Sequence, residues 1–450
     1  MSLLELLGRI VARARLGEAV EVYGLDETTT TVKAYEGEVE SLSSARTRGV
    51  GVRVIDGGRV GYSSTADLSE TALAETLDEA RANARVGTSD EANVLPQAAQ
   101  ALGELPELWD PAFHEFATED KIAAVITLEA AVRGAGPPVK GVDSAVYGDQ
   151  VRTAAIASTA GVCGAYRRCD AYVAVNALAE GNGAGVGASA YGFDLARTVG
   201  GLDPEAAATE AVGRATRLLG GRKPPSTKPL VLLDPYATTS LLEVLSGALT
   251  GQAVQKGRSA FATRLGEQVA GPHVALIDDG RLVAGPAAAP WDGEGVPTGR
   301  TTLIEAGHLA GWLHNTYTAT KQGVASTGNA RRAGFLSLPG VSPSNLYFVP
   351  GDEDQAALLA RADTAFYCQQ VIGIHSGANP ISGDFSVGVS GLMVRGGEFA
   401  EPIREAALAG TFLGMLSGLV AVGSDLRFIP FGWGLGGATL LIEGMTLAGE

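Results

Sequence analysis

The stretch from residue 220 to residue 229, GGRKPPSTKP, decides how the chain is divided. It concentrates glycine, proline and serine and has few apolar side chains, which is typical of a linker. A chain of 450 residues also exceeds the size at which one hydrophobic core keeps growing. We therefore predict two domains, residues 1–220 and 230–450, joined by a linker at 221–229.

The sequence before the linker mixes strands and helices. Residues 48–64, RGVGVRVIDGGRVGYSS, alternate apolar residues on both sides of Asp56-Gly57-Gly58. This pattern predicts a β-hairpin, because glycine accepts the positive φ that a tight turn needs. Asp67 and Glu70 have the spacing of a capping box and open a predicted helix that reaches about residue 85. Two more helices are predicted, over residues 119–132 and 203–220. The N-terminal domain is therefore expected to be mixed α/β.

The sequence after the linker is richer in strands. Residues 230–235, LVLLDP, predict a buried strand, and residues 240–250 predict the helix that follows it. From Val269 onward, short apolar runs alternate with glycine turns, as in antiparallel sheets. We therefore expect an α+β protein of two domains, with a C-terminal domain rich in antiparallel sheet and barrel-like in form.

One uncharged segment raises the question of a membrane. Residues 406–423, AALAGTFLGMLSGLVAVG, are 18 residues without a charge, which only just reaches the length of a membrane span. No aromatic belt flanks them and no other segment resembles a span. The segment is therefore predicted to be a buried helix, and the protein is not expected to interact with a membrane.

Charge and cysteine content restrict the partners and the compartment. The net charge of −16 disfavours direct binding to nucleic acid, whose phosphates are also negative. The three cysteines, Cys163, Cys169 and Cys368, form no CxxC pair, so neither a zinc knuckle nor a disulfide framework is indicated. The first residues form a charged helix pattern and not a signal peptide. These features favour the cytoplasm.

No motif in the sequence supplies a complete catalytic site. Asp292 and Glu294, in WDGEG, could act as an acid and base pair or bind a divalent ion, but aspartate and glycine at this spacing are also common in turns. His308 and His314 flank a predicted turn and could meet, whereas His375 stands alone. None of these histidines has a second histidine at the i, i+4 spacing of a zinc-binding helix. All five residues are kept as candidates for lining a cavity.

Several long stretches, in order along nearly the whole chain, resemble the TldD/TldE (PmbA) family. They are GVGVRVIDGGRVGYSSTADLSETAL, GRSAFATRLGEQVA, WDGEGVPTGRTTLIEAGHLAGWLHNTYTA, ANPISGDFSVGVSG and the C-terminal LVAVGSDLRFIP with GGATLLIEGMTLAG. The resemblance implies a link to peptide maturation and to proteins described as modulators of DNA gyrase. It also implies a two-subunit metalloprotease, a heterodimer whose active site lies in a cavity that admits extended or unfolded peptides.

In the TldD branch, the helix that corresponds to residues 240–250 carries His-Glu-x-x-x-His, and a late cysteine completes the zinc site. The resemblance places Leu242 and Gly247 at the two histidine positions and Glu243 at the glutamate position. The C-terminal stretch VGSDLRFIPFGWGLGG, residues 422–437, has no cysteine. Neither leucine nor glycine has a lone pair to give to zinc. The pattern is therefore similar to the metal-free TldE (PmbA) branch.

This resemblance leads to a hypothesis with two alternatives. The chain is expected to be the non-catalytic subunit that contributes cavity wall and dimer interface, with no cofactor of its own, while a TldD-like partner supplies zinc. One alternative is a self-contained homodimeric hydrolase of a small amide or peptide-like substrate, which would use Asp292, Glu294 or the histidines. The other is a non-enzymatic scaffold that binds peptide or protein.

Overall fold

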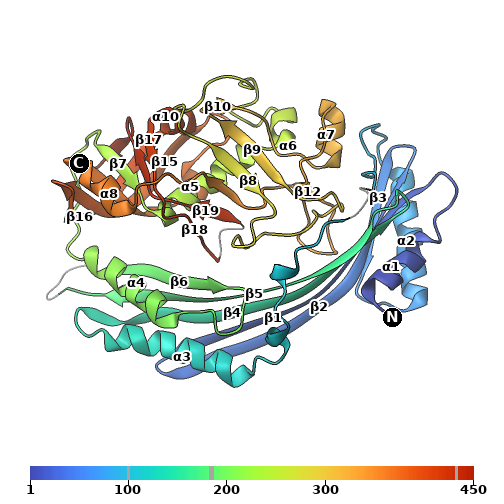
Figure 1. Cartoon of the computed structure of the whole chain (residues 1–450), viewed down its shortest axis with the longest axis horizontal. Coiled ribbons are helices and arrows are strands. Elements are labelled where there is room, and N and C mark those ends of the chain that lie inside the picture. Colours follow the sequence, from blue (N-terminus) through green and yellow to red (C-terminus); the bar gives the residue numbers. More distant parts are fainter. Residues whose placement is uncertain (99–101, 182–186, 431–433) are drawn as a thin grey trace.

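The computed structural model describes residues 1–98, 102–181, 187–430 and 434–450. Its most extended element is a curved antiparallel sheet of six strands in the order β3-β2-β1-β4-β5-β6, which lies beneath the second half of the chain in Figure 1. The strands are β1 (Ala19–Tyr35), β2 (Glu38–Asp56), β3 (Arg59–Thr65), β4 (Val139–Ser158), β5 (Cys163–Ala179) and β6 (Ala188–Ala196). The predicted hairpin is confirmed: it joins β2 to β3, and Gly57 and Gly58 both have positive φ.

Helices cover one face of this first sheet. Successive side chains of a strand point to opposite faces, so every second side chain of a strand faces the helices. Val20, Val22 and Val32 of β1 are buried against helices, whereas Tyr23 and Leu25 face the opposite way. The helices of this part are α1 (Leu3–Val11), α2 (Glu70–Val86), α3 (Thr118–Gly134) and α4 (Pro204–Arg217), with short 3₁₀ turns at Pro106–Leu108 and Pro111–His114.

The second half of the chain packs over the uncovered face of the first sheet (Figure 1). It contains a mixed sheet of seven strands, a mixed sheet of six strands and a ribbon of two strands. The first contains β7 (Leu230–Leu233), β14 (Thr364–Ile372), β15 (Asp384–Arg395), β16 (Glu398–Thr411), β17 (Leu419–Val422), β20 (Leu440–Ile442) and β21 (Thr446–Ala448). The second contains β8 (Leu276–Asp279), β9 (Arg300–Glu305), β10 (His308–Leu309), β13 (Leu346–Phe348), β18 (Arg427–Phe428) and β19 (Leu435–Gly437), and the ribbon is β11 (Ala330–Arg331) with β12 (Gly340–Val341).

A central helix, α5 (Pro235–Ala248), lies in the core of this second half. Its apolar side chains pack in one cluster with strands of both large sheets. The remaining helices are short: α6 (Gly251–Gln255), α7 (Thr316–Gln322), α8 (Gln355–Ala360), α9 (Ile374–Gly377) and α10 (Phe412–Ser417). The expected α+β class is confirmed. The barrel-like form is wrong for the described residues, because each large sheet has two separate end strands and does not close.

Three further expectations need correction. Residues 406–423 form the end of β16, α10 and β17 instead of one buried helix, because β16 pairs with β15 and β21 and alternates buried with partly buried residues. Asp67 does not cap α2: its carboxylate accepts the Ser69 N–H, and Ser69 is the N-cap. The helix expected at 240–250 begins earlier, at Pro235, because Asp234 caps it. No described helix has both the length and the apolar character needed to cross a bilayer.

Two features of this fold bear on function. Residues 38–48 of β2 form one outer edge of the first sheet, since β3 pairs only with residues 50–56. All eleven residues from Glu38 to Arg48 are exposed. The segment 221–229 runs along the seven-stranded sheet, where Arg222 bridges to Ile403 and Thr227 to Leu447.

Candidate functional site

The helix α5 holds the three positions at which the resemblance would place a metal-binding motif. Leu242 points into the core and is 1% exposed. Glu243 is exposed, as is Gly247, and a Cβ added at Gly247 would meet nothing within 4 Å. The helix thus has an apolar inner face and an outer face that carries one carboxylate.

These residues do not fit a zinc ion. Leu242 is a hydrocarbon side chain packed in a core, and Gly247 has no side chain at all, so neither offers an electron pair. In the described ranges no three His, Cys, Asp or Glu residues are grouped in a way that could hold a metal. Residues 431–433 of the C-terminal stretch without cysteine lie outside the described residues.

Gly247 of α5 and Gly251, the first residue of α6, are expected to respond in opposite ways to substitution by alanine. Gly247→Ala is expected to raise the free energy of unfolding by up to about 1 kcal/mol, because alanine restricts the unfolded chain and meets open space. Gly251→Ala is expected to lower it by about 1–3 kcal/mol, because its Cβ would lie 2.2 Å from the His314 ring. Urea denaturation of both variants checks this, and a shift of the same sign in both would contradict it.

Asp292 and Glu294 lie in one turn, which comprises residues 292–296, and both side chains are buried. The Asp292 carboxylate accepts hydrogen bonds from the N–H groups of Glu294 at 2.9 Å, Val296 at 3.0 Å and Ala330 at 2.9 Å. The Glu294 carboxylate accepts one from the Thr316 N–H at 2.9 Å and pairs with the Arg53 guanidinium at 2.9 Å. Both carboxylates therefore already hold the turn and its neighbours in place.

The ion pairs around Glu294 join the two halves of the chain. Arg53 of β2 contacts Glu294 and also Glu21 of β1, the latter at 2.6 Å. Arg332 pairs with the other oxygen of Glu21 and stacks over the Tyr23 ring at 5.1 Å. The side chains of Arg53, Glu21, Glu294 and Arg332 are each at most 8% exposed. Although burial opposes its charge, the two carboxylates raise the pKa of Arg53 above its usual value.

Burial and the neighbouring Glu294 raise the pKa of Asp292 to about 7. The folded protein therefore holds this proton at pH values where the unfolded chain, with a pKa of 3.8, has released it. The resulting stability is present below pH 3.8 and is lost as the pH rises through about 7.

Asp292→Asn is expected to flatten the fall in the free energy of unfolding between pH 5 and pH 7.5, because asparagine does not titrate. Urea denaturation at a series of pH values checks this, with Asp352→Asn at an exposed position as the control. If the wild type and Asp292→Asn showed equal slopes over this range, the prediction would fail.

The three histidine candidates occupy different surroundings. His314 is 4% exposed, its Nδ1 lies 3.1 Å from the Thr318 hydroxyl, and burial lowers its pKa. His308 is exposed on β10, with Nδ1 3.1 Å from the Ala306 carbonyl, and His375 is exposed on α9. The structure places only His314 close to the Asp292–Glu294 turn, through α7, whose first residue Thr316 donates to Glu294.

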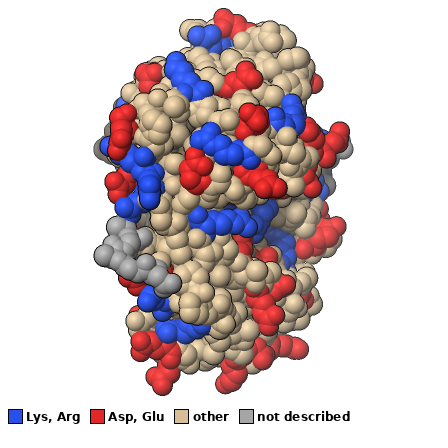
Figure 2. All heavy atoms as spheres, turned by 90° about the vertical axis from the view of Figure 1, so that its left-hand side faces the viewer, with Lys and Arg blue, Asp and Glu red and all other residues tan. Residues whose placement is uncertain are grey.

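A hollow between the two halves contains arginines that the sequence did not single out together. Arg152 of β4, Arg168 of β5 and Arg331 of β11 line both parts of this hollow, which measure about 140 and 480 Å³. On the face shown in Figure 2, several lysine and arginine side chains lie near the middle of the molecule, with acidic side chains among them. The sequence signal was weak because these arginines are far apart along the chain.

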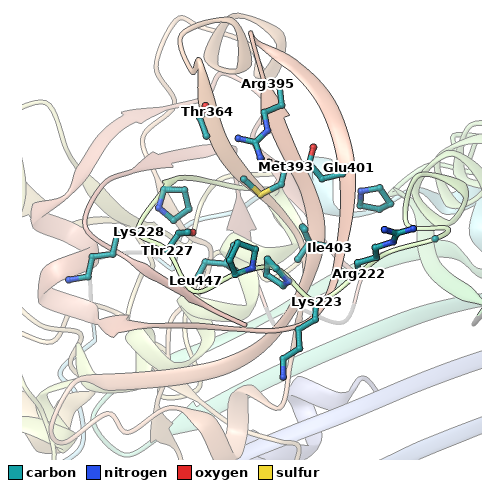
Figure 3. Close-up of a pocket in the computed structure, with 15 residues that line it drawn as sticks. Arg222, Lys223, Thr227, Lys228, Thr364, Met393, Arg395, Glu401, Ile403 and Leu447 are labelled. Carbon is teal, nitrogen blue, oxygen red and sulfur yellow. Dashed lines mark hydrogen bonds and ion pairs between the residues drawn. The ribbon is translucent and has the colours of Figure 1, made fainter. Parts of the chain in front are cut away.

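A second hollow of about 640 Å³ lies between the segment 221–229 and the seven-stranded sheet. Figure 3 shows Met393, Ile403 and Leu447 in its wall, while the charged ends of Lys223 and Lys228 point away from its middle. At its rim, Arg395 pairs with Glu401 at 2.7 Å. Its wall is mainly apolar, and its charged groups either pair with each other or point outward.

Comparison with known proteins identifies the family. Three domain profiles of the PmbA/TldA metallopeptidases match this chain: domain 1 at residues 20–84, the central domain at 112–219 and the C-terminal domain at 226–449. The chain belongs to the PmbA/TldD/TldE family. It is 26% identical over 413 residues to the "Metalloprotease PmbA" of Escherichia coli O157:H7, which covers 91% of this chain and 88% of that protein.

Solved structures of the family have the same fold. A candidate modulator of a DNA gyrase from Thermotoga maritima MSB8 superposes with a TM-score of 0.90 at 28% identity, covering 99% of each chain. TldE from Thermococcus kodakarensis superposes with a TM-score of 0.87 over 99% of each chain, and at 20% identity this similarity concerns the fold alone. Family membership makes a metallopeptidase-like protein the starting point for function.

Proposed function

We propose that this chain is the zinc-less, TldE-like subunit of a two-subunit cytoplasmic metalloprotease that cleaves extended or unfolded peptides. The observation that carries the proposal is the chemistry of α5, whose motif positions hold a core leucine, Leu242, and a glycine, Gly247. A member of a metallopeptidase family that has no donors there would depend on a TldD-like partner for zinc. The chain itself would contribute cavity wall and dimer interface.

The free edge of β2 supports the peptide part of the proposal. An extended peptide can add to an exposed strand through main-chain hydrogen bonds. Residues 38–48 present such an edge over their whole length. The buried turn with Asp292 and Glu294 does not favour a self-contained hydrolase, since both carboxylates are already engaged by backbone N–H groups or Arg53.

The test is co-expression of this chain with a family member from the same organism that carries His-Glu-x-x-x-His. The pair is expected to cleave an unfolded peptide, and this chain alone is expected to bind no stoichiometric zinc and to cleave nothing. Glu243→Gln in this chain is expected to leave the activity of the pair unchanged. Equal activity of the partner without this chain, or cleavage by this chain alone that Glu243→Gln abolishes, would disprove the proposal. A stable homodimer that captures no such partner would favour a scaffold.

A further inference from the structure

The hollow between the halves has an unusual charge arrangement for a protein with a net charge of −16. Arg152 of β4 and Arg168 of β5 are direct cross-strand partners. Like charges at such positions repel each other and destabilise a sheet unless other groups compensate for them. Arg152 has Glu27 at 2.5 Å, and Arg168 has Asp170 at 3.0 Å.

The available carboxylates do not balance the arginines. Asp170 is shared, because Arg197 also lies 3.5 Å from it. Arg331 forms no ion pair with any described residue, and the one hydrogen bond of its guanidinium goes from Nη1 to the Pro343 carbonyl at 3.3 Å. Asp149 and Asp292 also line the hollow, but Asp149 pairs with Lys121 at 2.6 Å and Asp292 accepts three backbone N–H groups. The four arginines, Arg152, Arg168, Arg197 and Arg331, therefore have only Glu27 and Asp170 as ion-pair partners among the described residues.

The positive charge in this hollow is also poorly solvated. The Arg168 side chain is only 12% exposed, and its buried Nε has no hydrogen-bond partner among the residues that the structure describes. Burial, together with the charges of Arg168 and Arg152, lowers the pKa of Arg331 to about 10. Uncompensated buried charge is costly, and a bound anion would remove much of that cost.

We propose that this hollow is a binding site for an oxyanion, a carboxylate or a phosphate group, held between Arg168 and Arg331, with Arg152 adding positive charge. Guanidinium groups suit this task, because their planar set of N–H donors matches the oxygens of carboxylate and phosphate.

The walls of the site indicate which kind of molecule carries the oxyanion. Tyr23, Tyr166 and Trp291 line the smaller part of the hollow, and the rings of Tyr166 and Trp291 lie 4.8 Å apart. An apolar group beside the anionic group would therefore find aromatic contacts. The C-terminus of a peptide combines these features, and this assignment, unlike the oxyanion site itself, rests on the proposed function.

The experiment measures binding to the purified full chain by isothermal titration calorimetry at low ionic strength. The probes are an N-acetylated tripeptide of two alanines and a phenylalanine with a free carboxylate, the same peptide as its C-terminal amide, and inorganic phosphate. Arg331→Met is expected to weaken binding of the anionic probe at least about tenfold, as loss of a charged hydrogen bond does. Arg300→Met, at an exposed position outside the hollow, is expected to bind like the wild type.

Arg331→Met is expected to fold, because no carboxylate is left unpaired by it. Arg331→Lys provides a second variant that keeps the charge but loses the planar donors.

Binding of the free acid but not the amide would support a peptide carboxylate. Binding of phosphate alone, lost in Arg331→Met, would support the oxyanion site with a phosphate ligand. If no probe bound, or if both Arg331 variants bound like the wild type, the inference would be overturned. Peptide cleavage by the two-subunit pair would stand independently of that result.

Discussion

Arg53→Met is expected to lower the free energy of unfolding by about 3–5 kcal/mol, the usual cost of removing one partner from a buried ion pair. The substitution leaves two carboxylates, Glu21 and Glu294, without the guanidinium that lies 2.6 and 2.9 Å from them. Both carboxylates are only 1% exposed, so water cannot replace the lost contacts. Arg332 remains beside Glu21 but not beside Glu294. Urea denaturation at neutral pH measures the change.

The same strand offers a matched control. Arg48 of β2 pairs with Asp26 at 3.2 Å, but its side chain is 43% exposed. Arg48→Met is therefore expected to change stability by less than about 1 kcal/mol, as surface ion pairs do. Adding Glu294→Gln to Arg53→Met is expected to recover part of the loss, because one unpaired charge disappears. Equal effects of the Arg53 and Arg48 substitutions would contradict a larger contribution of the buried ion pairs to stability.

Arg214→Met is expected to be the second large loss, about 3 kcal/mol, because it leaves the buried Asp234 without its cation. The Arg214 guanidinium lies 2.6 Å from one Asp234 oxygen and 3.2 Å from the other. Asp234 also caps α5 by accepting the Tyr236 N–H, and it accepts the Tyr367 hydroxyl at 2.6 Å. These remaining donors explain why the expected loss is smaller than that for Arg53→Met.

A control for Arg214 lies one turn further along α4. Arg217 is exposed and forms no ion pair with a described residue, although it stacks over the Phe399 ring at 5.4 Å. Arg217→Met is expected to change the free energy of unfolding by less than about 1 kcal/mol. A double variant with Arg214→Met and Asp234→Asn, measured as a double-mutant cycle, separates the ion pair from the helix cap. Complete additivity in that cycle would contradict the assigned ion pair.

Turns and helix caps could be predicted from the sequence, because residues close together in the chain determine them. The turn at Gly57-Gly58 and the Asp203 cap of α4 follow from residues within a few positions of each other. The secondary structure of residues 406–423 could not be predicted in this way. Its small and apolar residues suit either a helix or a strand, and pairing with β15 and β21 decides for the strand.

The arginine sites depend on contacts between distant residues. Arg53 meets Glu294 across 241 positions, and the Arg152–Arg168 pair requires the register of β4 on β5. Neither relation leaves a pattern in a single sequence. The resemblance placed Leu242 and Gly247 on a helix, but only the fold shows that the Leu242 side chain is packed in the core and that Gly247 is exposed with open space beside it.

The segment 221–229 has a consequence for proteolysis. Both of its lysines precede proline, which trypsin disfavours, so the bond that trypsin can cut is the exposed Arg222-Lys223. Backbone bridges at Arg222 and Thr227 attach the segment to the second half. The ion pairs Arg53–Glu294 and Arg214–Asp234 connect the residues before the segment with those after it. A chain nicked there would still elute from a sizing column as one particle, and its fragments would separate only under denaturing conditions.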